Sequence, residues 1–213
     1  MTTLPLRIGV LLIGTIQLLD LATIDLLYMT SPTYLTSLSL PQTLVSMGRP
    51  CEFHYISSSI HNSTANPDTN KTTTTTTTTS QLTITLTDHT TDPAVAAGNL
   101  DIIVIPGPSP ISVAPSDADL DFVRSHNAAN TSILSICTGA YVIGYAGIAE
   151  GKQITGPRPL VPELRRREHY PAQLVDTILL AADITERAAK YTSSASPSTN
   201  EEGNILDDSA ESD

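Results

Sequence analysis

The sequence predicts an α/β fold in which helices cover a mainly parallel sheet. The chain has 213 residues, of which 40% are hydrophobic, so it is long enough to bury one core. Aromatic residues make up only 4% and Trp is absent, so the core must be aliphatic, as in parallel sheets built from Val, Ile and Leu. Short apolar runs alternate with stretches of helical spacing, which completes the α/β pattern.

The first three elements are predicted in the order strand, helix, strand. Residues 6–13 form an almost continuous apolar run, which is typical of a buried strand. Residues 17–28 have helical spacing, and Pro32 and Pro41 interrupt the segment that follows. Residues 51–56 are predicted to form the second strand. The helix is expected to face the sheet through an apolar stripe made of Leu18, Leu21, Ala22, Leu26 and Met29.

A low-complexity insertion follows at residues 57–80. It is dominated by Ser, Thr and Asn and includes eight consecutive Thr at 72–79. Because it has almost no apolar side chains to bury, a mobile surface loop is expected. Residues 81–87 then alternate between polar and apolar, which favours a strand at an exposed sheet edge.

The middle of the chain predicts two further strands around one helix. Residues 101–105 are apolar after the first position and are the best candidate for a central strand. Ser116 is expected to cap a helix that ends near Asn127, with acidic residues in its first turn. Residues 132–136 form the next strand.

Two helices and a tail complete the expected domain. Residues 138–149 are apolar on nearly all sides, which predicts a buried central helix, and residues 171–191 have a second long helical pattern. Residues 192–213 carry six acidic residues and no Lys or Arg, so a disordered acidic tail is expected. The chain is therefore interpreted as one domain over 1–191 followed by this tail.

Composition excludes several classes of partner. The formal net charge of −11 argues against binding to the phosphate backbone of nucleic acid. The N-terminal apolar run lacks a preceding basic region and is too short to span a bilayer, so neither a signal peptide nor a membrane segment is expected. Cys51 and Cys137 form neither a disulfide framework nor a metal-ligand spacing, which favours a reducing, cytoplasmic setting without metal or cofactor.

Cys137 is the main candidate for chemistry because it stands where a buried strand runs into a buried helix. A helix N-terminus favours an anion, so the thiol pKa is expected to be lowered and the thiolate to be both nucleophile and oxidation site. The alternative is a buried structural cysteine that acts as a small apolar side chain.

Two further segments are expected to lie at the same edge of the sheet. Pro106, Gly107 and Pro108 follow the central strand, where the N–H groups of Gly107 and Thr138 would hold a developing oxyanion. Asp20 lies in an apolar stretch after the first strand and would carry protons for a nearby thiol. The alternatives are an ordinary Pro-Gly turn and a charge at a helix N-terminus.

These three segments, in this order, resemble the ThiJ/PfpI family of the class I glutamine amidotransferase-like superfamily over most of 6–156. The resemblance implies a flavodoxin-like three-layer sandwich. It also implies that Cys137 is the nucleophile at a nucleophile elbow, Asp20 the acidic partner, and Gly107 part of the oxyanion hole with Thr138.

Asp20 together with Cys137-Thr138-Gly139 resembles the isocyanide hydratase branch, and residues 146–152 and 155–158 are similar to its fungal members. In that branch the Cys attacks the isocyanide carbon, the Asp manages protons, and the product is an N-substituted formamide. A small-molecule substrate follows from this resemblance, and a homodimer is one assembly compatible with it.

Three features depart from the family pattern. Thr138 stands where other branches have a His after the Cys, so a Cys-His dyad is unsupported, and the five histidines are expected mostly at the surface. Pro108 replaces a Gly and has no N–H to donate. Between Arg167 and Glu168 a Trp-containing hairpin and a Thr-Ser-Gly-Gly segment are missing, so the sheet is expected to be incomplete on its C-terminal side.

Three functional hypotheses follow. The first is a cysteine-dependent hydratase or hydrolase of small electrophilic substrates such as isocyanides. The second is a non-catalytic redox or stress-response protein in which Cys137 is oxidised without turnover. The third is a degenerate, truncated family member without activity.

Overall fold

The computed structural model describes residues 4–59, 64–66, 71–109 and 114–154, with shorter stretches at 156–157, 159, 162 and 173–174. All of these lie in one compact unit, residues 1–177. The missing segment expected near Arg167 and the acidic tail at 192–213 fall outside the described residues.

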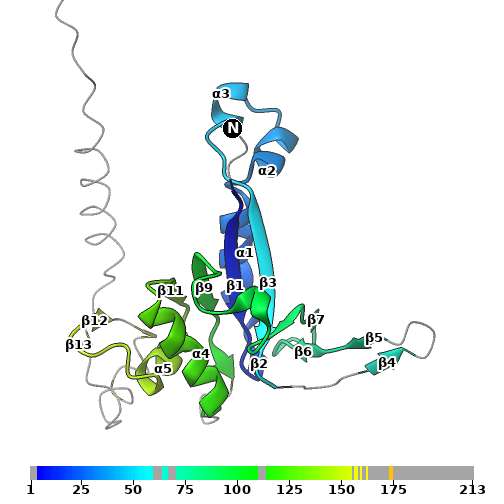
Figure 1. The fold of residues 1–213 in the computed structure, drawn as a ribbon. Coiled ribbons are helices and arrows are strands. Elements are labelled where there is room, and N and C mark those ends of the chain that lie inside the picture. Colours follow the sequence, from blue (N-terminus) through cyan, green and yellow to red (C-terminus); the bar gives the residue numbers. More distant parts are fainter. Residues whose placement is uncertain are drawn as a thin grey trace, which may run out of the picture. The chain divides into compact units, whose positions relative to one another are not determined.

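The centre of the fold is a five-stranded parallel sheet in the order β11-β9-β1-β3-β8 (Figure 1). Every pair in it is parallel. This confirms the predicted α/β class. The five strands are β1 (Leu6–Leu11), β3 (Cys51–Ser57), β8 (Asp88–His89), β9 (Ile102–Ile105) and β11 (Ser132–Ser135).

The strand order creates a switch point beside β1. The chain leaves β1 for β3 on one side, and later returns to place β9 on the other side of β1. The four longer strands thus have the order of a flavodoxin-like sheet, with the two-residue β8 added next to β3. In such sheets the carboxyl ends of the two strands at the switch point, here β1 and β9, border the ligand crevice.

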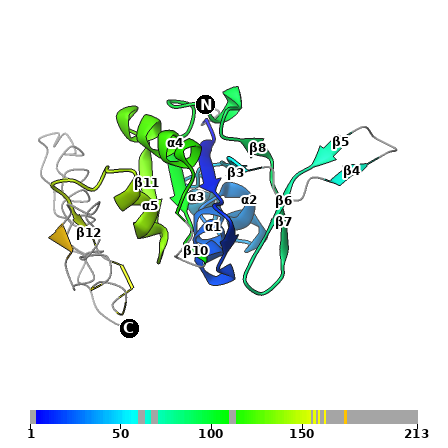
Figure 2. The same cartoon turned by 90° about the horizontal axis from the view of Figure 1, so that it is seen from below.

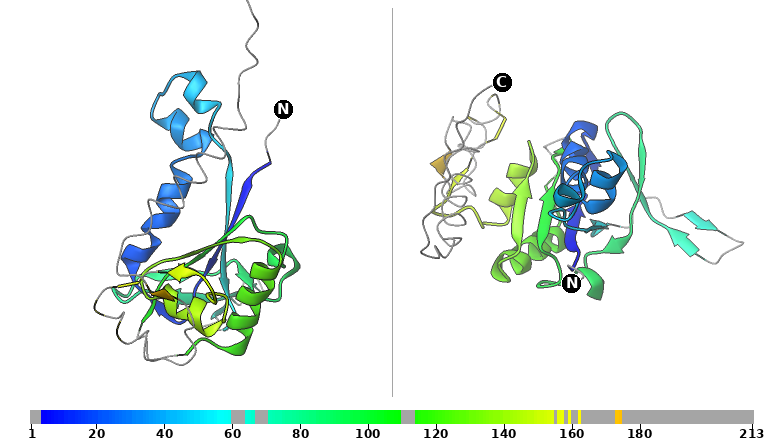
Figure 3. Two further views of the ribbon diagram at one scale, coloured as in Figure 1. Left: turned by 90° about the vertical axis from the view of Figure 1, so that its left-hand side faces the viewer. Right: turned by 90° about the horizontal axis from the view of Figure 1, so that it is seen from above.

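Alternation along the strands divides the core into two layers, because successive side chains point to opposite faces. Ile8, Val10 and Val104 face α1 (Ala22–Tyr28), whereas Ile103 and Ile105 face α4 (Asp117–Ala128) and α5 (Gly139–Tyr145). Figure 3 shows α1 and α4 on opposite sides of the sheet, and Figure 2 shows α5 beside α4. The result is the expected three-layer sandwich.

The predicted apolar stripe of the first helix is correct at Leu21 and wrong at its other four residues. The segment begins as a 3₁₀ turn, η1 (Leu18–Leu21), before α1. A 3₁₀ helix has fewer residues per turn than an α-helix, so the side of this segment that faces the sheet differs from that of a continuous α-helix. Leu21, Ile24 and Leu27 contact the sheet. Leu26 is 64% exposed, and Leu18 and Met29 are also exposed.

Two short helices that the sequence reading missed begin at the prolines. Pro32 is the first residue of α2 (Pro32–Ser37), and the Ser31 side chain accepts a hydrogen bond from the Tyr34 N–H. Pro41 is the N-cap of α3 (Gln42–Val45). Proline suits the first helical position because its missing N–H would have no partner there.

The Thr-rich insertion contains strands where the structure describes it, at positions where a loop was expected. β4 (Thr64–Asn66) pairs with β5 (Lys71–Thr73), and β6 (Thr75–Thr77) pairs with β7 (Thr83–Thr85), both antiparallel. β7 therefore belongs to a hairpin and does not extend the central sheet, whose edge is β8. Thr is β-branched and suits strands, so the repeat favours extended structure.

The insertion docks through buried threonines. The Thr76 hydroxyl donates to the Gly14 carbonyl at 2.8 Å, and the Thr79 N–H donates to the Ile16 carbonyl at 2.9 Å. Thr76 and Thr78 are both buried. Polar threonines can be buried here because their hydroxyls find partners.

The later helices follow the prediction in part. Ser116 caps α4 in a capping box with Asp119, as expected. α5 is buried but shorter than predicted, because the backbone turns at Gly147 with φ of 71°. β12 (Gln153–Ile154) pairs with β13 (Gln173–Leu174), so the helix predicted to begin at 171 is wrong at these two residues. The rest of that helix lies outside the described residues.

Two histidines expected at the surface are buried. The His126 ring packs at a tilt of 50° against Phe122 with ring centroids 4.4 Å apart, and its Nε2–H donates to the Val95 carbonyl at 3.0 Å. His54 lies 2.9 Å from Asp88 through Nδ1. Among the helices in the described ranges, none is long and apolar enough to cross a membrane.

Candidate active site

The structure gathers all the residues predicted for the site at the carboxyl ends of the central strands. Asp20 follows β1, Gly107 follows β9, and Cys137 follows β11. β10 (Pro108–Ser109) pairs antiparallel with β2 (Thr15–Ile16), which ties the turn after β9 to the turn after β1. The site thus borders the switch point of the sheet.

Asp20 is the buried acid of the site. It lies on η1, only 6% exposed, and its Oδ2 accepts a hydrogen bond from the Gly107 N–H at 2.9 Å. Burial raises the pKa of Asp20 because it penalises the charged form, and the Gly107 hydrogen bond partly opposes this rise. Within the described residues, no Lys, Arg or His pairs with Asp20, so its charge has no counter-ion there.

Gly107 permits the close approach of three segments. A Cβ at this position would overlap the Thr138 hydroxyl and would lie 2.7 Å from Asp20 Oδ2. Only glycine fits without displacing one of them. The Gly107 N–H, which we expected to face an oxyanion, donates to Asp20 in this structure.

Cys137 occupies a strained turn between β11 and α5. Its φ of 53° lies in the left-handed region, which costs free energy for a residue with a Cβ. The turn closes through hydrogen bonds from the Gly139 N–H to the Ile136 carbonyl at 2.8 Å and from the Ala140 N–H to the Cys137 carbonyl at 3.3 Å. Such a geometry is typical of a nucleophile elbow.

The expected lowering of the Cys137 pKa is wrong. Burial and the nearby Asp20 carboxylate both raise the pKa of the Cys137 thiol, and hydrogen bonds from Thr138 only partly oppose them. The expectation rested on the helix N-terminus alone. The causes that raise the pKa are burial by neighbouring elements and the charge of Asp20, which comes from a distant part of the chain.

Thr138 links the turn that carries Cys137 to the turn after β9. It is buried, and its hydroxyl donates to the Pro108 carbonyl at 3.1 Å. Pro108 therefore contributes an acceptor even though it has no N–H to donate. The sequence reading missed this role, because the pairing links residues 30 positions apart and leaves no local pattern.

No cluster of three or more His, Cys, Asp or Glu side chains within the described ranges has a geometry that would hold a metal ion. The chemistry available at the site is that of one thiol, one carboxyl group and the hydroxyl between the loops.

Comparison with known proteins identifies the family that the chain resembles. The model of the DJ-1/PfpI family matches residues 49–202, which is more than half of the chain. An isonitrile hydratase of Pseudomonas putida is 40% identical over 57 residues, a stretch that covers 26% of this chain and 25% of that enzyme.

Solved structures show the fold. A ThiJ/PfpI family protein from Pseudomonas syringae superposes with a TM-score of 0.51 at 17% identity, covering 73% of this chain and 51% of that one. Drosophila melanogaster DJ-1beta gives a TM-score of 0.54 at 15% identity, covering 82% and 76%. Sheet order, site geometry and the family match agree: the chain belongs to the DJ-1/PfpI family.

Proposed function

We propose that this protein is a cysteine-dependent hydratase that adds water to the terminal carbon of a small isocyanide. Cys137 is the nucleophile and Asp20 carries the protons. The observation that carries the proposal is the placement of a buried acid, Asp20, and a thiol in a strained strand-to-helix turn, Cys137, at the same edge of the sheet. The similarity of a 57-residue stretch to an isonitrile hydratase favours this substrate class.

Protonation of the resting site explains why the acid is needed. A thiol with a raised pKa is mostly protonated at neutral pH, so it needs a base when it attacks. Asp20 is that base, and burial makes it a better proton acceptor than a solvated carboxylate. The uncompensated negative charge of Asp20 also favours a neutral substrate, which an isocyanide is.

The proposed reaction has two stages, formation of a thioimidate and its hydrolysis. The Cys137 sulfur bonds to the terminal carbon of R–N≡C, its proton passes to Asp20, and Asp20 returns a proton to that carbon, which gives the thioimidate R–N=CH–S. Water then adds across the C=N bond, with its hydroxyl on the same carbon and its other hydrogen on nitrogen; the C–S bond breaks, the hydroxyl proton returns to the sulfur, and R–NH–CHO leaves. Nothing is oxidised or reduced.

The raised pKa of Cys137 weighs against direct oxidation as the main role. Peroxide reacts with the thiolate, and a higher pKa lowers the thiolate fraction at neutral pH. A small-molecule substrate and a reducing cytoplasmic setting for the free thiol are part of the proposal, with a homodimer as one compatible assembly.

The test is an isocyanide hydration assay on the full chain. Cyclohexyl isocyanide is converted to its formamide by the wild type, and Cys137→Ala abolishes the reaction. Asp20→Asn lowers the rate by about 10²- to 10⁴-fold, the usual contribution of a positioned acid-base group.

Cys51→Ala is the matched control, because Cys51 is a free cysteine on β3 that has no role in the proposed reaction. Full activity in Cys51→Ala with none in Cys137→Ala is the expected result. Equal rates in Cys137→Ala and the wild type, or no conversion of cyclohexyl isocyanide by a folded wild type, contradict the proposal.

A further inference from the structure

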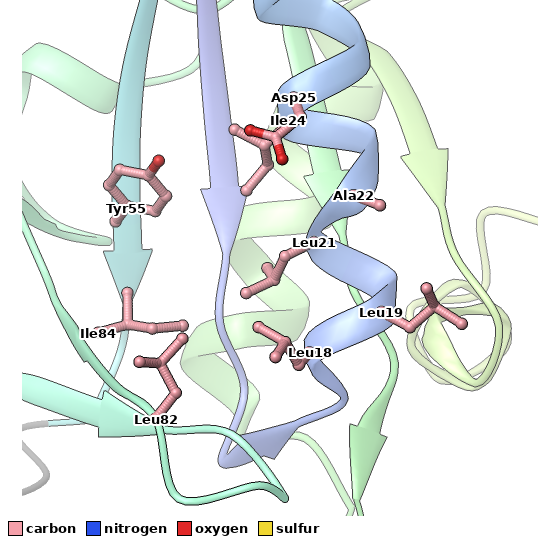
Figure 4. Close-up of a pocket in the computed structure, with 9 residues that line it drawn as sticks. All are labelled: Leu18, Leu19, Leu21, Ala22, Ile24, Asp25, Tyr55, Leu82 and Ile84. Atoms are coloured by element: carbon pink, nitrogen blue, oxygen red, sulfur yellow. The ribbon is translucent and has the colours of Figure 1, made fainter.

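A hollow in the surface lies outside the candidate active site. A groove of about 400 Å³ runs between η1 and α1 on one side and β3 and β7 on the other (Figure 4). That volume falls within the usual range of small-molecule sites. Asp20 does not line the groove, although its neighbours Leu19 and Leu21 do.

The walls of the groove are mainly aliphatic. Leu21 and Ile24 come from η1 and α1, and Ile84 comes from β7. Leu18 and Leu82 stand at the same end of the groove and are 44% and 51% exposed. A ligand that covers these two leucines removes apolar surface from water, which favours binding.

One wall is made by the β6–β7 hairpin, whose first strand lies in the Thr-rich insertion. Leu82 and Ile84 lie on or next to the β6–β7 hairpin, which the Thr76 hydroxyl and the Thr79 N–H fasten to the loop after β1. The hairpin therefore places two apolar side chains opposite η1, where they form one wall of the groove.

The other end of the groove is polar. Figure 4 shows the Asp25 carboxylate and the Tyr55 hydroxyl there, on the side away from Leu82. Asp25 is exposed and forms no ion pair with a Lys, Arg or His of the described ranges. The Tyr55 phenol stays protonated, because burial and the charge of Asp25 raise its pKa, so it can both donate and accept a hydrogen bond.

We propose that this groove binds a small apolar amine in its ammonium form. The ammonium group pairs with Asp25 and donates to the Tyr55 hydroxyl, and the hydrocarbon part covers Leu18 and Leu82. Charge decides between ligand classes here. An anion is repelled by Asp25, and a neutral apolar molecule gains nothing from that carboxylate.

The probes are three molecules of the same length and different charge: hexylammonium, 1-hexanol and hexanoate. Ligand-observed NMR titrations use the Cys137→Ala protein, so that binding or reaction at the thiol does not contribute. Hexylammonium is expected to bind about threefold to tenfold more tightly than 1-hexanol, as fits one partly exposed ion pair, and hexanoate more weakly than both.

Two variants assign the effect to the groove. Asp25→Asn removes the preference for hexylammonium over 1-hexanol, and Leu82→Ala weakens the binding of both. Glu150→Gln is the matched control: Glu150 is also an exposed carboxylate, it lies outside the groove, and its replacement leaves the preference unchanged.

Each outcome bears on the proposal. Equal affinity for the three probes overturns it, and so does loss of the preference in Glu150→Gln as well as in Asp25→Asn. Absence of hexylammonium binding at millimolar concentration also overturns it. If Leu82→Ala does not fold, the comparison of Asp25→Asn with Glu150→Gln still decides, because both are exposed surface changes.

Discussion

The N–H of Gly107 donates a hydrogen bond of 2.9 Å to Oδ2 of Asp20. This contact joins the turn after β9 to the turn after β1 across the switch point of the sheet. It holds the carboxylate where its charge raises the pKa of Cys137. The Asp20 and Cys137 protons are therefore coupled, because ionising either group makes ionisation of the other more costly.

The first prediction concerns the titration of Cys137. Asp20→Asn removes the negative charge that opposes ionisation of the thiol, so the pKa of Cys137 falls relative to the wild type, while burial still acts to raise it. The rate of alkylation by iodoacetamide, measured against pH in a Cys51→Ala background, shifts to lower pH in Asp20→Asn.

Asp25→Asn is the control for that shift. Asp25 is exposed and does not contribute to the pKa of Cys137, so its replacement leaves the alkylation profile in place. An identical profile in the wild type and Asp20→Asn shows that the two groups do not interact.

The second prediction tests the space at Gly107. Gly107→Ala places a Cβ onto the Thr138 hydroxyl and against Asp20, so the free energy of unfolding falls by about 1–3 kcal/mol, as for other overpacked sites. Urea unfolding measures this loss. Alkylation of Cys137 also changes its pH profile, because Asp20 is displaced.

A double-mutant cycle identifies the cause. Thr138→Ala removes the hydroxyl that the new Cβ would meet, so Gly107→Ala costs less in that background than in the wild type. Equal costs in both backgrounds mean that the strain lies elsewhere than against Thr138.

Sequence alone predicted which segments meet at the edge of the sheet that holds the candidate site, but not the electrostatics there. Cys137 at a strand-to-helix turn and Gly107 after a central strand could be predicted, because strand runs and turn residues are local patterns. The raised pKa of the thiol could not. It depends on Asp20, which is distant in the sequence, and on burial by neighbouring elements. A local pattern does not carry that information.

The dependence on distant parts of the chain also explains which features of the fold were predicted wrongly. The stripe through Leu18 and Leu26 failed because a 3₁₀ turn precedes α1 and changes which residues face the sheet. The buried state of Thr76 was not predictable from a run of identical residues, because only its register against Gly14 distinguishes it from its neighbours.

The third prediction concerns pH and His126. Burial lowers the pKa of His126, so in the range below its ordinary value the unfolded state binds more protons than the folded state. The contribution of His126 to the free energy of unfolding is therefore fully present above about pH 6.5, and it decreases as the pH drops below that value. A single group contributes a slope of at most about 1.4 kcal/mol per pH unit.

His126→Gln removes this titration. The variant is less stable at pH 7 because it loses the ring contact with Phe122, but its free energy of unfolding changes less than that of the wild type between pH 7 and pH 5. Urea titrations of both proteins at the two pH values give the comparison. Other titrating groups are common to both, so parallel pH dependence would rule out His126 as the source.

The fourth prediction uses the Thr run itself. Thr76→Val keeps the shape of a buried side chain but removes the hydroxyl that donates to the Gly14 carbonyl, so the free energy of unfolding falls by about 1 kcal/mol. Thr79→Val changes an exposed side chain in the same run and keeps the backbone bond to Ile16, so its effect stays within about 0.5 kcal/mol. Urea unfolding of the two variants distinguishes a docked hairpin, in which one threonine matters and the other does not, from a solvated loop, in which both changes are neutral.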